Sequence, residues 1–295
     1  MSVAIIINPV AGAAGGAAGA EDFGALARHV ALETGDRADV FITARSGHAR
    51  ELAQAARADG ARLVVACGGD GTINEVASAL AFGEIPLAVV PAGSGNGLAR
   101  ALGICSDPAD ALRAALRSEP QSIDVGEIDG RFFVNVAGVG FDAHVASLFN
   151  APDNAMRGFA GYAFFTVRGL WEYEAGVYDV VTPHSRATVR ALLIALANGA
   201  EFGNGVRIAP LARVDDGALD LVVVEERSRM TTIWNMRRLL SGALDRAPIW
   251  SSRRVKEVTI ESEQPMMFHV DGESVQGGTR LQARIHPAAL KICSR

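Results

Sequence analysis

The stretch VVACGGDGTINE at residues 64–75 contributes most to the prediction of the fold. Its first residues are β-branched or small, which is typical of a short buried strand. Gly-Gly-Asp-Gly-Thr at residues 68–72 then allows a tight turn, and a helix is predicted over residues 72–81. A buried strand that ends in glycines and is followed at once by a helix indicates a phosphate-binding turn.

The chemistry of this turn favours a polyphosphate ligand. Glycines allow the backbone to approach phosphate closely, and the helix N-terminus offers unpaired N–H groups and the positive end of a dipole. The carboxylate of Asp70 repels phosphate, so it needs a cation between them, and Mg²⁺ held through water is the natural one. The alternative is that Gly71 and Thr72 merely cap a helix. The five-residue combination favours phosphate binding.

A second glycine-rich turn, VPAGSGNGLAR, occupies residues 90–100. It again follows a predicted strand and precedes a predicted helix. Ser94 and Asn96 are able to hydrogen-bond phosphate or ribose, or simply to cap the helix. Arg100 lies one turn into the helix, where it either reaches a phosphate or remains an ordinary surface arginine.

A third segment, FHVDGE at residues 268–273, carries two carboxylates. A hydroxyl group that accepts a phosphoryl group needs a general base nearby, and Asp271 or Glu273 could serve. Asp-Gly is also a common hairpin turn, and on the residues alone this second interpretation is favoured.

The first third of the chain alternates strands and helices, which predicts a doubly wound, mainly parallel α/β sheet over residues 1–123. In such sheets ligands bind beyond the carboxyl ends of the strands, where both glycine turns fall. The predicted strands are Val3–Ile7, Val40–Thr43, Leu63–Ala66 and Leu87–Val90. The predicted helices are Ala20–Thr34, Ala49–Asp59, Thr72–Ala81, Leu98–Leu102 and Asp107–Arg117.

Residues 124–295 predict a second, mainly antiparallel domain, because short strands alternate there with hairpin turns such as Asp129-Gly130. Its last strand, Leu281–His286, and the C-terminal tail are candidates to return to the first domain. The other predicted strands are Val125–Ile128, Arg131–Val136, Val177–Thr182, Thr188–Leu196, Leu219–Val224 and Val255–Ile260. One aromatic-rich helix is predicted over Phe159–Tyr173.

Composition narrows the class of protein. The chain has 295 residues, of which 49% are hydrophobic and 21% charged, so a globular protein is predicted. The formal net charge of -5 argues against a general attraction to nucleic acid. Three cysteines without a close pair favour a reducing, cytoplasmic compartment. No apolar run approaches the ~18 residues that span a bilayer, so we expect a soluble protein or one that touches membranes from outside.

Taken together, the three segments resemble the diacylglycerol kinase catalytic-domain family of lipid kinases, which includes sphingosine kinases and bacterial soluble lipid kinases. The resemblance extends over nearly the whole chain. It includes residues 8–12, 68–75, 91–100, 124–126, 135–142, 209–212, 215–220 and 270–273. Gly-Gly-Asp-Gly-Thr alone is shared with NAD kinases and phosphofructokinases, but the order of all these segments is specific.

The resemblance implies an α/β nucleotide domain, a β-sandwich-like second domain and an active site in the cleft between them. It implies ATP and Mg²⁺ as cofactors, with Asp70 in the Mg²⁺ network and Asp271 as the base beside Glu273. Which of the two takes the proton is left open, with a preference for Asp271. The implied ATP-site residues are Asn8, Pro9, Thr43, Gly68, Gly69, Asp70, Gly71, Thr72, Asn74, Glu75, Gly93, Ser94, Gly95 and Asn96.

The resemblance also implies a structural Mg²⁺ loop, formed by Asp216 with the carbonyl groups of Arg213 and Ala218. The residues alone indicate a turn at 215–217.

This sequence departs from the family's pattern at two places, and both concern the identity of the lipid substrate. Gly97 stands where bacterial diacylglycerol kinases often have a carboxylate, and the loop at residues 8–16 lacks a basic residue that some members carry.

A lipid substrate requires contact with a membrane. Residues 227–256 contain eight basic residues and one acid, interleaved with Trp234, Trp250 and aliphatic side chains. Such a stretch either lies on an anionic inner-membrane surface or packs its apolar face on the second domain. The aromatic residues of 159–173 either form core or wall an acyl-chain pocket.

Other functions remain open on the sequence. The leading hypothesis is ATP-dependent phosphorylation of a lipid hydroxyl of the diacylglycerol type, and the alternatives are a sphingoid-base kinase, a kinase for a soluble acceptor such as NAD, and a non-catalytic nucleotide- or lipid-binding regulator. Homodimerisation is also left open. A Rossmann dehydrogenase is disfavoured, because Asn8-Pro9 follows the first strand.

Overall fold

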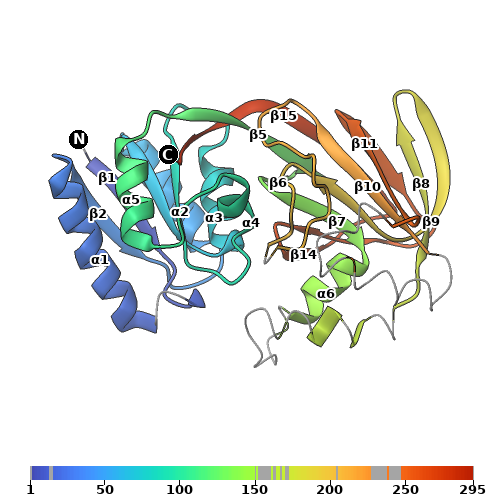
Figure 1. Ribbon diagram of the computed structural model, residues 1–295, viewed down its shortest axis with the longest axis horizontal. Helices are drawn as coiled ribbons and strands as arrows, with labels where there is room; N and C mark the ends of the chain where they lie inside the picture. Colours follow the sequence, from blue (N-terminus) through green and yellow to red (C-terminus); the bar gives the residue numbers. More distant parts are fainter. Residues whose placement is uncertain are drawn as a thin grey trace. The chain divides into compact units, whose positions relative to one another are not determined.

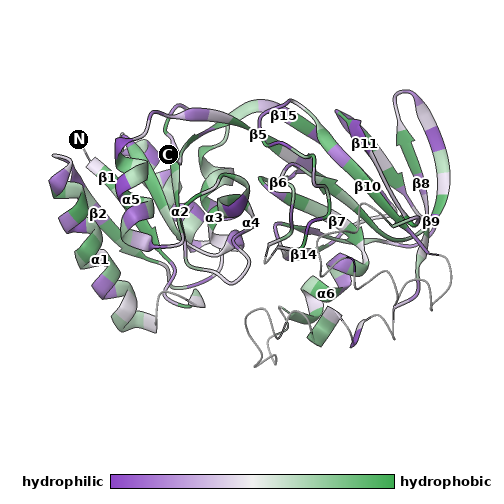
Figure 2. Ribbon diagram, in the orientation of Figure 1, coloured by the Kyte–Doolittle hydropathy of each residue, from purple (hydrophilic) through white to green (hydrophobic). Residues whose placement is uncertain are grey.

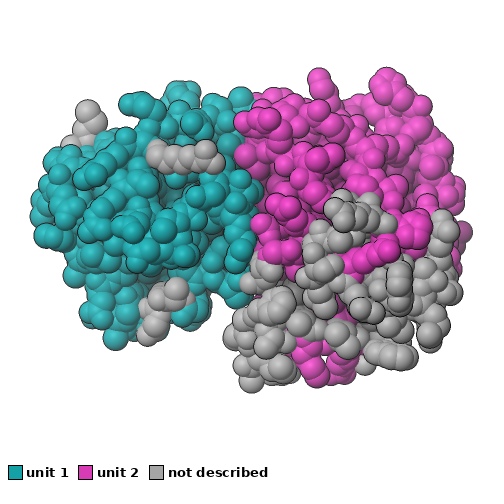
Figure 3. Space-filling view, in the orientation of Figure 1, with its two compact units in different colours: residues 1–124, 288–295 teal, residues 125–287 magenta. Residues whose placement is uncertain are grey.

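Two compact units divide the chain in the computed structural model (Figure 3). The structure describes residues 2–12, 16–149, 151, 161, 164–166, 168–169, 173–203, 205–226, 238 and 247–294. Unit 1 comprises Met1–Asp124 and Ala288–Arg295, and unit 2 comprises Val125–Pro287. The chain passes between the units within two strands, β5 (Gln121–Ile128) and β15 (Arg280–Cys293).

Unit 1 is built on a parallel sheet in the order β2-β1-β3-β4, with the last residues of β15 beside β4 (Figure 1). The strands of the alternating region are β1 (Ser2–Ile7), β2 (Arg37–Ile42), β3 (Leu63–Gly68) and β4 (Leu87–Pro91). The described helices are α1 (Gly16–Glu33), α2 (His48–Ala58), α3 (Asp70–Leu80), α4 (Gly97–Ala101) and α5 (Pro108–Arg117).

Both faces of this sheet are covered. Every residue of β3 and β4 is buried, which explains why they are continuous apolar runs, green in Figure 2. One core cluster joins alternate residues of β1 and β3 to buried residues of α1 and α5. The intervening residues, such as Ile6 and Val64, are also buried and point to the other face. The predicted α/β fold is therefore confirmed in this half of the chain.

The strand order creates a topological switch point between β1 and β3. From β1 the chain crosses to β2 on one side, and from β2 it returns to β3 on the other side. Parallel sheets of this kind bind ligands beyond the carboxyl ends of the two strands at the switch point. β1 ends at Ile7, directly before Asn8, and β3 ends at Gly68. The fold therefore places two of the predicted segments at its natural ligand site.

Unit 2 is mainly antiparallel, in agreement with the predicted class. The long strand β9 (Ser185–Ala197) is central, because it pairs with three neighbours, β7, β8 and β10. The remaining described elements of the unit are β6 (Arg131–Phe133), β7 (Val136–Gly140), α6 (Phe141–Phe149), β8 (Gly176–Thr182), β10 (Leu219–Glu225), β11 (Trp250–Val255), β12 (Glu257–Glu261), β13 (Met267–Val270) and β14 (Glu273–Gln276).

Successive buried residues of β9 alternate between two hydrophobic cores, one on each face of the sheet. Ile194 and Leu196 belong to a large cluster with Phe133 and Phe268, whereas Leu193 packs in a second cluster that includes residues of α6. The sheet is therefore apolar on both faces along this part of β9. This is the reason that its sequence is a continuous hydrophobic run rather than an alternating one.

One predicted strand differs from the structure in an informative way. Arg131–Val136 is predicted as a single strand, but β6 ends at Phe133 and β7 begins at Val136. The N–H groups of Val134 and Asn135 donate to the carboxylate of Asp271. A side chain 136 residues away therefore interrupts the strand, which no local pattern predicts.

Candidate active site

The two glycine turns of unit 1 lie against each other. A Cβ atom added to Gly93 would lie 2.5 Å from the Cα atom of Gly69 and 3.0 Å from Oδ1 of Asn96. The main chain joins the turns as well, since the N–H of Ala92 donates to the carbonyl of Gly68 at 2.9 Å. Only glycine fits where two backbones approach this closely. The two predicted phosphate turns thus form one continuous surface at the edge of the sheet.

The start of α3 offers main-chain donors at this surface. Its N-cap residue is Gly69, which has no side chain to satisfy the first N–H groups of the helix. The N–H groups of the first helical turn also carry the positive end of the helix dipole. The arrangement is chemically suited to a phosphate group, because it combines closely spaced glycines with an uncapped helix N-terminus.

Asn8 and Thr72 meet across the switch point. The amide Nδ2 of Asn8 donates to Oγ1 of Thr72 at 2.9 Å, and Asn8 Oδ1 accepts from the N–H of Val10 at 3.1 Å. The N–H of Asn8 itself donates to the carbonyl of Cys67 at 2.9 Å. The structure therefore brings together two predicted residues, Asn8 directly after β1 and Thr72 in the first turn of α3. Thr43 joins the same edge, because its N–H donates to the carbonyl of Ile7.

Asp70 connects the first glycine turn to the second. Its Oδ1 accepts a hydrogen bond from the N–H of Gly97 at 2.7 Å. Gly97 is the first residue of α4, so the carboxylate lies at the N-terminus of that short helix. The missing carboxylate at position 97 does not affect this contact, because the donor is a main-chain group.

The second turn is shaped by its own asparagine. Asn96 Oδ1 accepts from the N–H of Gly93 at 2.9 Å, and Asn96 Nδ2 donates to the carbonyl of Gly93 at 2.8 Å. Asn96 has a φ of 52°, in the left-handed region that asparagine tolerates. Arg100 donates to the carbonyl of Gly95 at 3.2 Å. Of the candidate phosphate-binding side chains here, Ser94 and Arg100 are exposed.

Glu75 has a structural partner that the sequence does not reveal. Its two carboxylate oxygens accept from the N–H groups of Gly47, Ala49 and Arg50 at 2.8, 3.0 and 3.3 Å. These donors form the N-terminus of α2, whose N-cap residue is a glycine. Glu75 therefore caps a neighbouring helix, and this role explains its presence without a ligand.

In unit 2 the predicted acidic segment is a tight hairpin. Asp271 and Gly272 have φ values of 47° and 87°, and they connect β13 to β14, in which Val270 pairs with Glu273. Positive φ at both central residues is the type I′ geometry for which Asp-Gly is suited. The hairpin interpretation of this segment is therefore confirmed.

The two carboxylates of the hairpin have opposite surroundings. Asp271 is 7% exposed, and its oxygens accept from the N–H groups of Val134, Asn135 and Val136 at 2.9 to 3.0 Å. Glu273 is exposed, and its side chain has no hydrogen-bond or ion-pair partner in the described part of the chain. A protonated Asp271 would direct an O–H group at main-chain donors, whereas Glu273 is able to take a proton without losing a contact.

A buried acid–histidine pair lies beside this hairpin. Nε2 of His269 is 3.2 Å from Oδ2 of Asp142, and both side chains are 4% exposed. Asp142 belongs to the segments of the family resemblance, but the sequence gives no signal that it pairs with His269, because the two residues are 127 positions apart. Burial raises the pKa of Tyr173 and Tyr178, and the nearby Asp142 carboxylate raises the pKa of each further.

The predicted Mg²⁺ loop is occupied by protein contacts. Oδ1 of Asp216 accepts from the N–H of Ala218 at 3.2 Å, and Oδ2 is 2.7 Å from the guanidinium of Arg254. In this arrangement the guanidinium of Arg254 balances the charge of the Asp216 carboxylate. No group of three metal-binding acidic, histidine or cysteine side chains occurs among the described residues. The magnesium loop stays a prediction.

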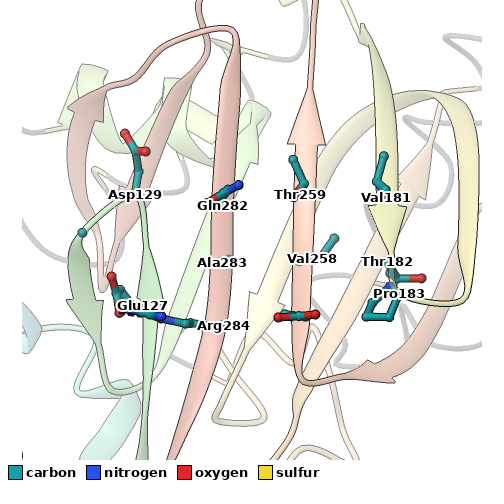
Figure 4. A pocket seen from close by; sticks show the side chains of 12 residues that line it. Glu127, Asp129, Val181, Thr182, Pro183, Val258, Thr259, Gln282, Ala283 and Arg284 are labelled. Carbon is teal, nitrogen blue, oxygen red and sulfur yellow. Dashed lines mark hydrogen bonds and ion pairs between the residues drawn. The ribbon is translucent and has the colours of Figure 1, made fainter.

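A shallow hollow of about 520 Å³ lies elsewhere in unit 2, over β5, β8, β12 and β15 (Figure 4). Glu127 lies in its lining, where Arg284 and His286 bind its carboxylate at 2.9 and 2.6 Å. None of the predicted site residues lines this hollow.

Two predicted features are largely outside the described residues. These are the basic stretch, of which residues 227–237 and 239–246 fall outside, and most of the aromatic segment 159–173. In the described part of the chain, no helix combines the length and apolarity that crossing a bilayer requires.

Comparison with known families matches both halves of the chain. Residues 2–128 match the family described as the diacylglycerol kinase catalytic domain. Residues 135–294 match the YegS C-terminal NAD kinase beta sandwich-like domain.

Curated relatives are similar over most of their length. A protein of Chromohalobacter salexigens named "Probable lipid kinase YegS-like" is 33% identical over 82% of this chain and 79% of its own. A protein of the same name from Pseudomonas aeruginosa is 33% identical over 88% of this chain and 85% of its own.

Solved structures share the fold. A crystal structure from Bacillus anthracis str. Sterne matches with a TM-score of 0.81 at 24% identity, covering 100% of this chain and 95% of that one. Another structure from that organism, described as a diacylglycerol kinase, has a TM-score of 0.73 at 20% identity and covers 97% of that chain.

Proposed function

Because this chain belongs to the diacylglycerol kinase catalytic-domain family, together with the YegS-like lipid kinases, we propose that it transfers the γ-phosphoryl group of ATP to a lipid hydroxyl in a Mg²⁺-dependent reaction. The acceptor is of the diacylglycerol type or a related lipid. The observation that carries the proposal is the contact of Gly69 with Gly93 beyond the carboxyl ends of β3 and β4, where a Cβ atom on Gly93 would leave no room.

The residues of unit 1 would bind the nucleotide. The uncapped start of α3 and the glycine turns would hold the phosphates, and Asn8, Thr43 and Ser94 lie at the same edge of the sheet or on the second turn. Asp70 is the acidic group of this surface and would take part in holding Mg²⁺. The ion, when bound, neutralises the charge that spreads over the transferred phosphoryl oxygens.

For the proton of the acceptor hydroxyl, the contacts favour Glu273 over Asp271. Glu273 is exposed and has no competing partner among the described residues, so its carboxylate is available as a base. Asp271 instead fixes the hairpin through three main-chain hydrogen bonds, which makes it a positioning residue. Phosphoryl transfer needs positioning and charge neutralisation most, and a base of this kind contributes typically about 10²- to 10⁴-fold.

Contact with a membrane follows from a lipid substrate. We propose a peripheral association with the inner membrane surface through the basic stretch at 227–256, in which the basic residues and Trp234 favour an interfacial position. Trp250, at the other end of the stretch, instead packs against the second core cluster of unit 2 and donates its indole N–H to the carbonyl of Ile208. Binding of nucleic acid is not part of the proposal, given the net charge of -5.

The experiment measures ADP release by the full-length protein with ATP and Mg²⁺ in mixed micelles. Separate reactions contain diacylglycerol, monoacylglycerol, sphingosine, ceramide or phosphatidylglycerol, and one contains NAD without lipid. Glu273→Gln and Asp271→Asn are compared with the wild-type protein. We expect turnover that depends on one class of lipid. We expect kcat to fall about 10²-fold or more in Glu273→Gln, with an unchanged unfolding midpoint.

Each other outcome has a defined meaning. Turnover with NAD and none with lipids would favour the soluble-acceptor kinase and overturn the proposal. ATP binding without any turnover would favour a regulator. If Asp271→Asn abolishes turnover while keeping a wild-type unfolding midpoint, and Glu273→Gln stays active, Asp271 is the base.

A further inference from the structure

The Asp142–His269 pair is connected to the hairpin that carries Glu273. Besides the contact of its Nε2 with Asp142, His269 uses Nδ1 to accept a hydrogen bond from the N–H of Gly272 at 3.3 Å. Gly272 is the second central residue of the turn and directly precedes Glu273. The imidazole therefore lies between a buried carboxylate and the turn.

These contacts define the tautomer of His269. Because Nδ1 accepts from Gly272, it carries no proton, and the neutral ring bears its hydrogen on Nε2. Nε2–H then donates to Oδ2 of Asp142. The other oxygen of Asp142 accepts from the N–H of Ala143 at 2.8 Å, at the start of α6. The carboxylate thus has one fixed orientation and holds the imidazole in the one tautomer that accepts from the turn.

The strand beside the pair is adapted to it. A Cβ atom on Gly138 of β7 would lie 1.8 Å from Oδ2 of Asp142 and 2.9 Å from Nε2 of His269. Gly138 pairs directly with His269 across the two strands. The centroid of the Phe202 ring lies 5.9 Å from the centroid of the His269 imidazole, so an aromatic side chain also packs beside the pair. A buried polar pair costs free energy unless its hydrogen bonds are made, and here the neighbouring backbone leaves space for both groups.

We propose that His269 is a positioning residue for the kinase reaction, which holds the N–H of Gly272 and thereby the direction in which Glu273 leaves the turn. Asp142 assists by fixing the tautomer of His269. This inference rests on the proposed function, in which Glu273 takes the proton of the lipid hydroxyl. The hairpin is then held on both sides, by His269 at Gly272 and by the main chain of 134–136 at Asp271.

Three substitutions of His269 separate its two hydrogen bonds. His269→Asn places an amide oxygen at the position of Nδ1 and retains an acceptor for Gly272. His269→Gln places an amide nitrogen near the position of Nε2 and retains a donor for Asp142. His269→Leu removes both. The matched control is His286→Asn, which removes a second histidine–acid pair of unit 2, that of His286 with Glu127.

The measurements are kcat and KM for ATP and for the lipid, with the unfolding midpoint of every variant. We expect His269→Leu and His269→Gln to lower kcat about 100-fold, because a displacement of about 1 Å in a catalytic group has effects of this size. His269→Asn should stay within about tenfold of the wild-type kcat. KM for ATP should not change, since the glycine turns lie in unit 1, and His286→Asn should keep the wild-type kcat.

The contrast between Asn and Gln keeps the test valid even if His269→Leu fails to fold. Equal kcat values in the Asn and Gln variants, or wild-type kcat in a folded Leu variant, would overturn the role of His269 and leave the kinase proposal intact. Absence of lipid-dependent turnover in the wild-type protein would overturn the proposed function and this role with it.

Discussion

Gly93 shows how a single missing Cβ atom defines the nucleotide surface. Gly69 and Gly93 are 24 positions apart in the sequence, yet their backbones are in contact. The sequence predicts both turns as phosphate-binding and places them at the same sheet edge. It does not predict the contact, because the distance between two loops depends on the strand order β1-β3-β4.

Substitution of Gly93 by alanine is therefore predicted to disturb both turns. The new methyl group would lie 2.5 Å from Cα of Gly69, so one backbone must move, at a cost of about 1–3 kcal/mol. ATP affinity should fall with it. The control is Gly71→Ala in the same motif, where a Cβ atom meets nothing within 4 Å and should leave the unfolding midpoint unchanged. Urea unfolding tests this, and equal midpoints for the two variants would contradict it.

At the scale of the element, α3 supports its neighbour as well as the ligand site. The first turn of α3 faces the predicted phosphate position, and Glu75, one turn later, accepts three N–H groups from the start of α2. The carboxylate also opposes the positive end of the α2 dipole. The Glu75 side chain of α3 thereby connects this helix to the N-terminus of α2, which follows Thr43 and the end of β2 in the chain.

Removal of this carboxylate should destabilise unit 1. Glu75→Ala leaves three N–H groups of α2 without their acceptor, and we expect a loss of about 1–2 kcal/mol in the free energy of unfolding. Glu51→Ala is the matched control, because Glu51 lies in the first turn of α2 and its carboxylate pairs, among the described residues, only with the exposed Arg45. A midpoint for Glu75→Ala no lower than that of Glu51→Ala would contradict the capping role.

The elements of unit 1 could be predicted because each carries its own local signal. β3 is a β-branched run that ends in glycines, and α5 starts with Asp107 as its N-cap and Pro108 in its first turn. In unit 2 the break between β6 and β7 escaped prediction, since it depends on the carboxylate of Asp271. The pairing of Asp142 with His269 escaped for the same reason, as both are contacts between residues distant in the sequence.

At the scale of the whole molecule, an ion pair at the edge of the parallel sheet links stability to pH. Asp36 is 8% exposed, and the Nε of Arg62 donates to its Oδ1 at 2.7 Å, with a second contact from the same guanidinium. The Arg62 hydrogen bonds hold the pKa of Asp36 below its ordinary value, although burial opposes this effect. Asp36 therefore stays ionised in the folded protein when it begins to protonate in the unfolded chain.

The sign of the pH dependence follows from this lowered pKa. The stabilisation is fully present above the unfolded-state pKa of about 4, and it is lost as pH falls through the lower folded-state pKa. Asp36→Asn should cost about 1–3 kcal/mol at pH 7, and the difference from wild type should shrink in acid. Asp39→Asn, which loses only an exposed pair with Arg37, is the control. Urea unfolding at several pH values measures this, and a pH-independent difference would contradict it.

The most direct measurement for the central claim uses ATP labelled with ¹⁸O in its γ-phosphoryl group, incubated with the protein, Mg²⁺ and the lipid that supports turnover. Transfer of the intact group to a lipid hydroxyl predicts a lipid phosphate that carries the labelled non-bridging oxygens, formed about 10²-fold more slowly, or slower still, in the Glu273→Gln reaction. Mass spectrometry of the extracted lipid reads this result. Label found only in inorganic phosphate, with unmodified lipid, would contradict the assignment of this chain as a lipid kinase.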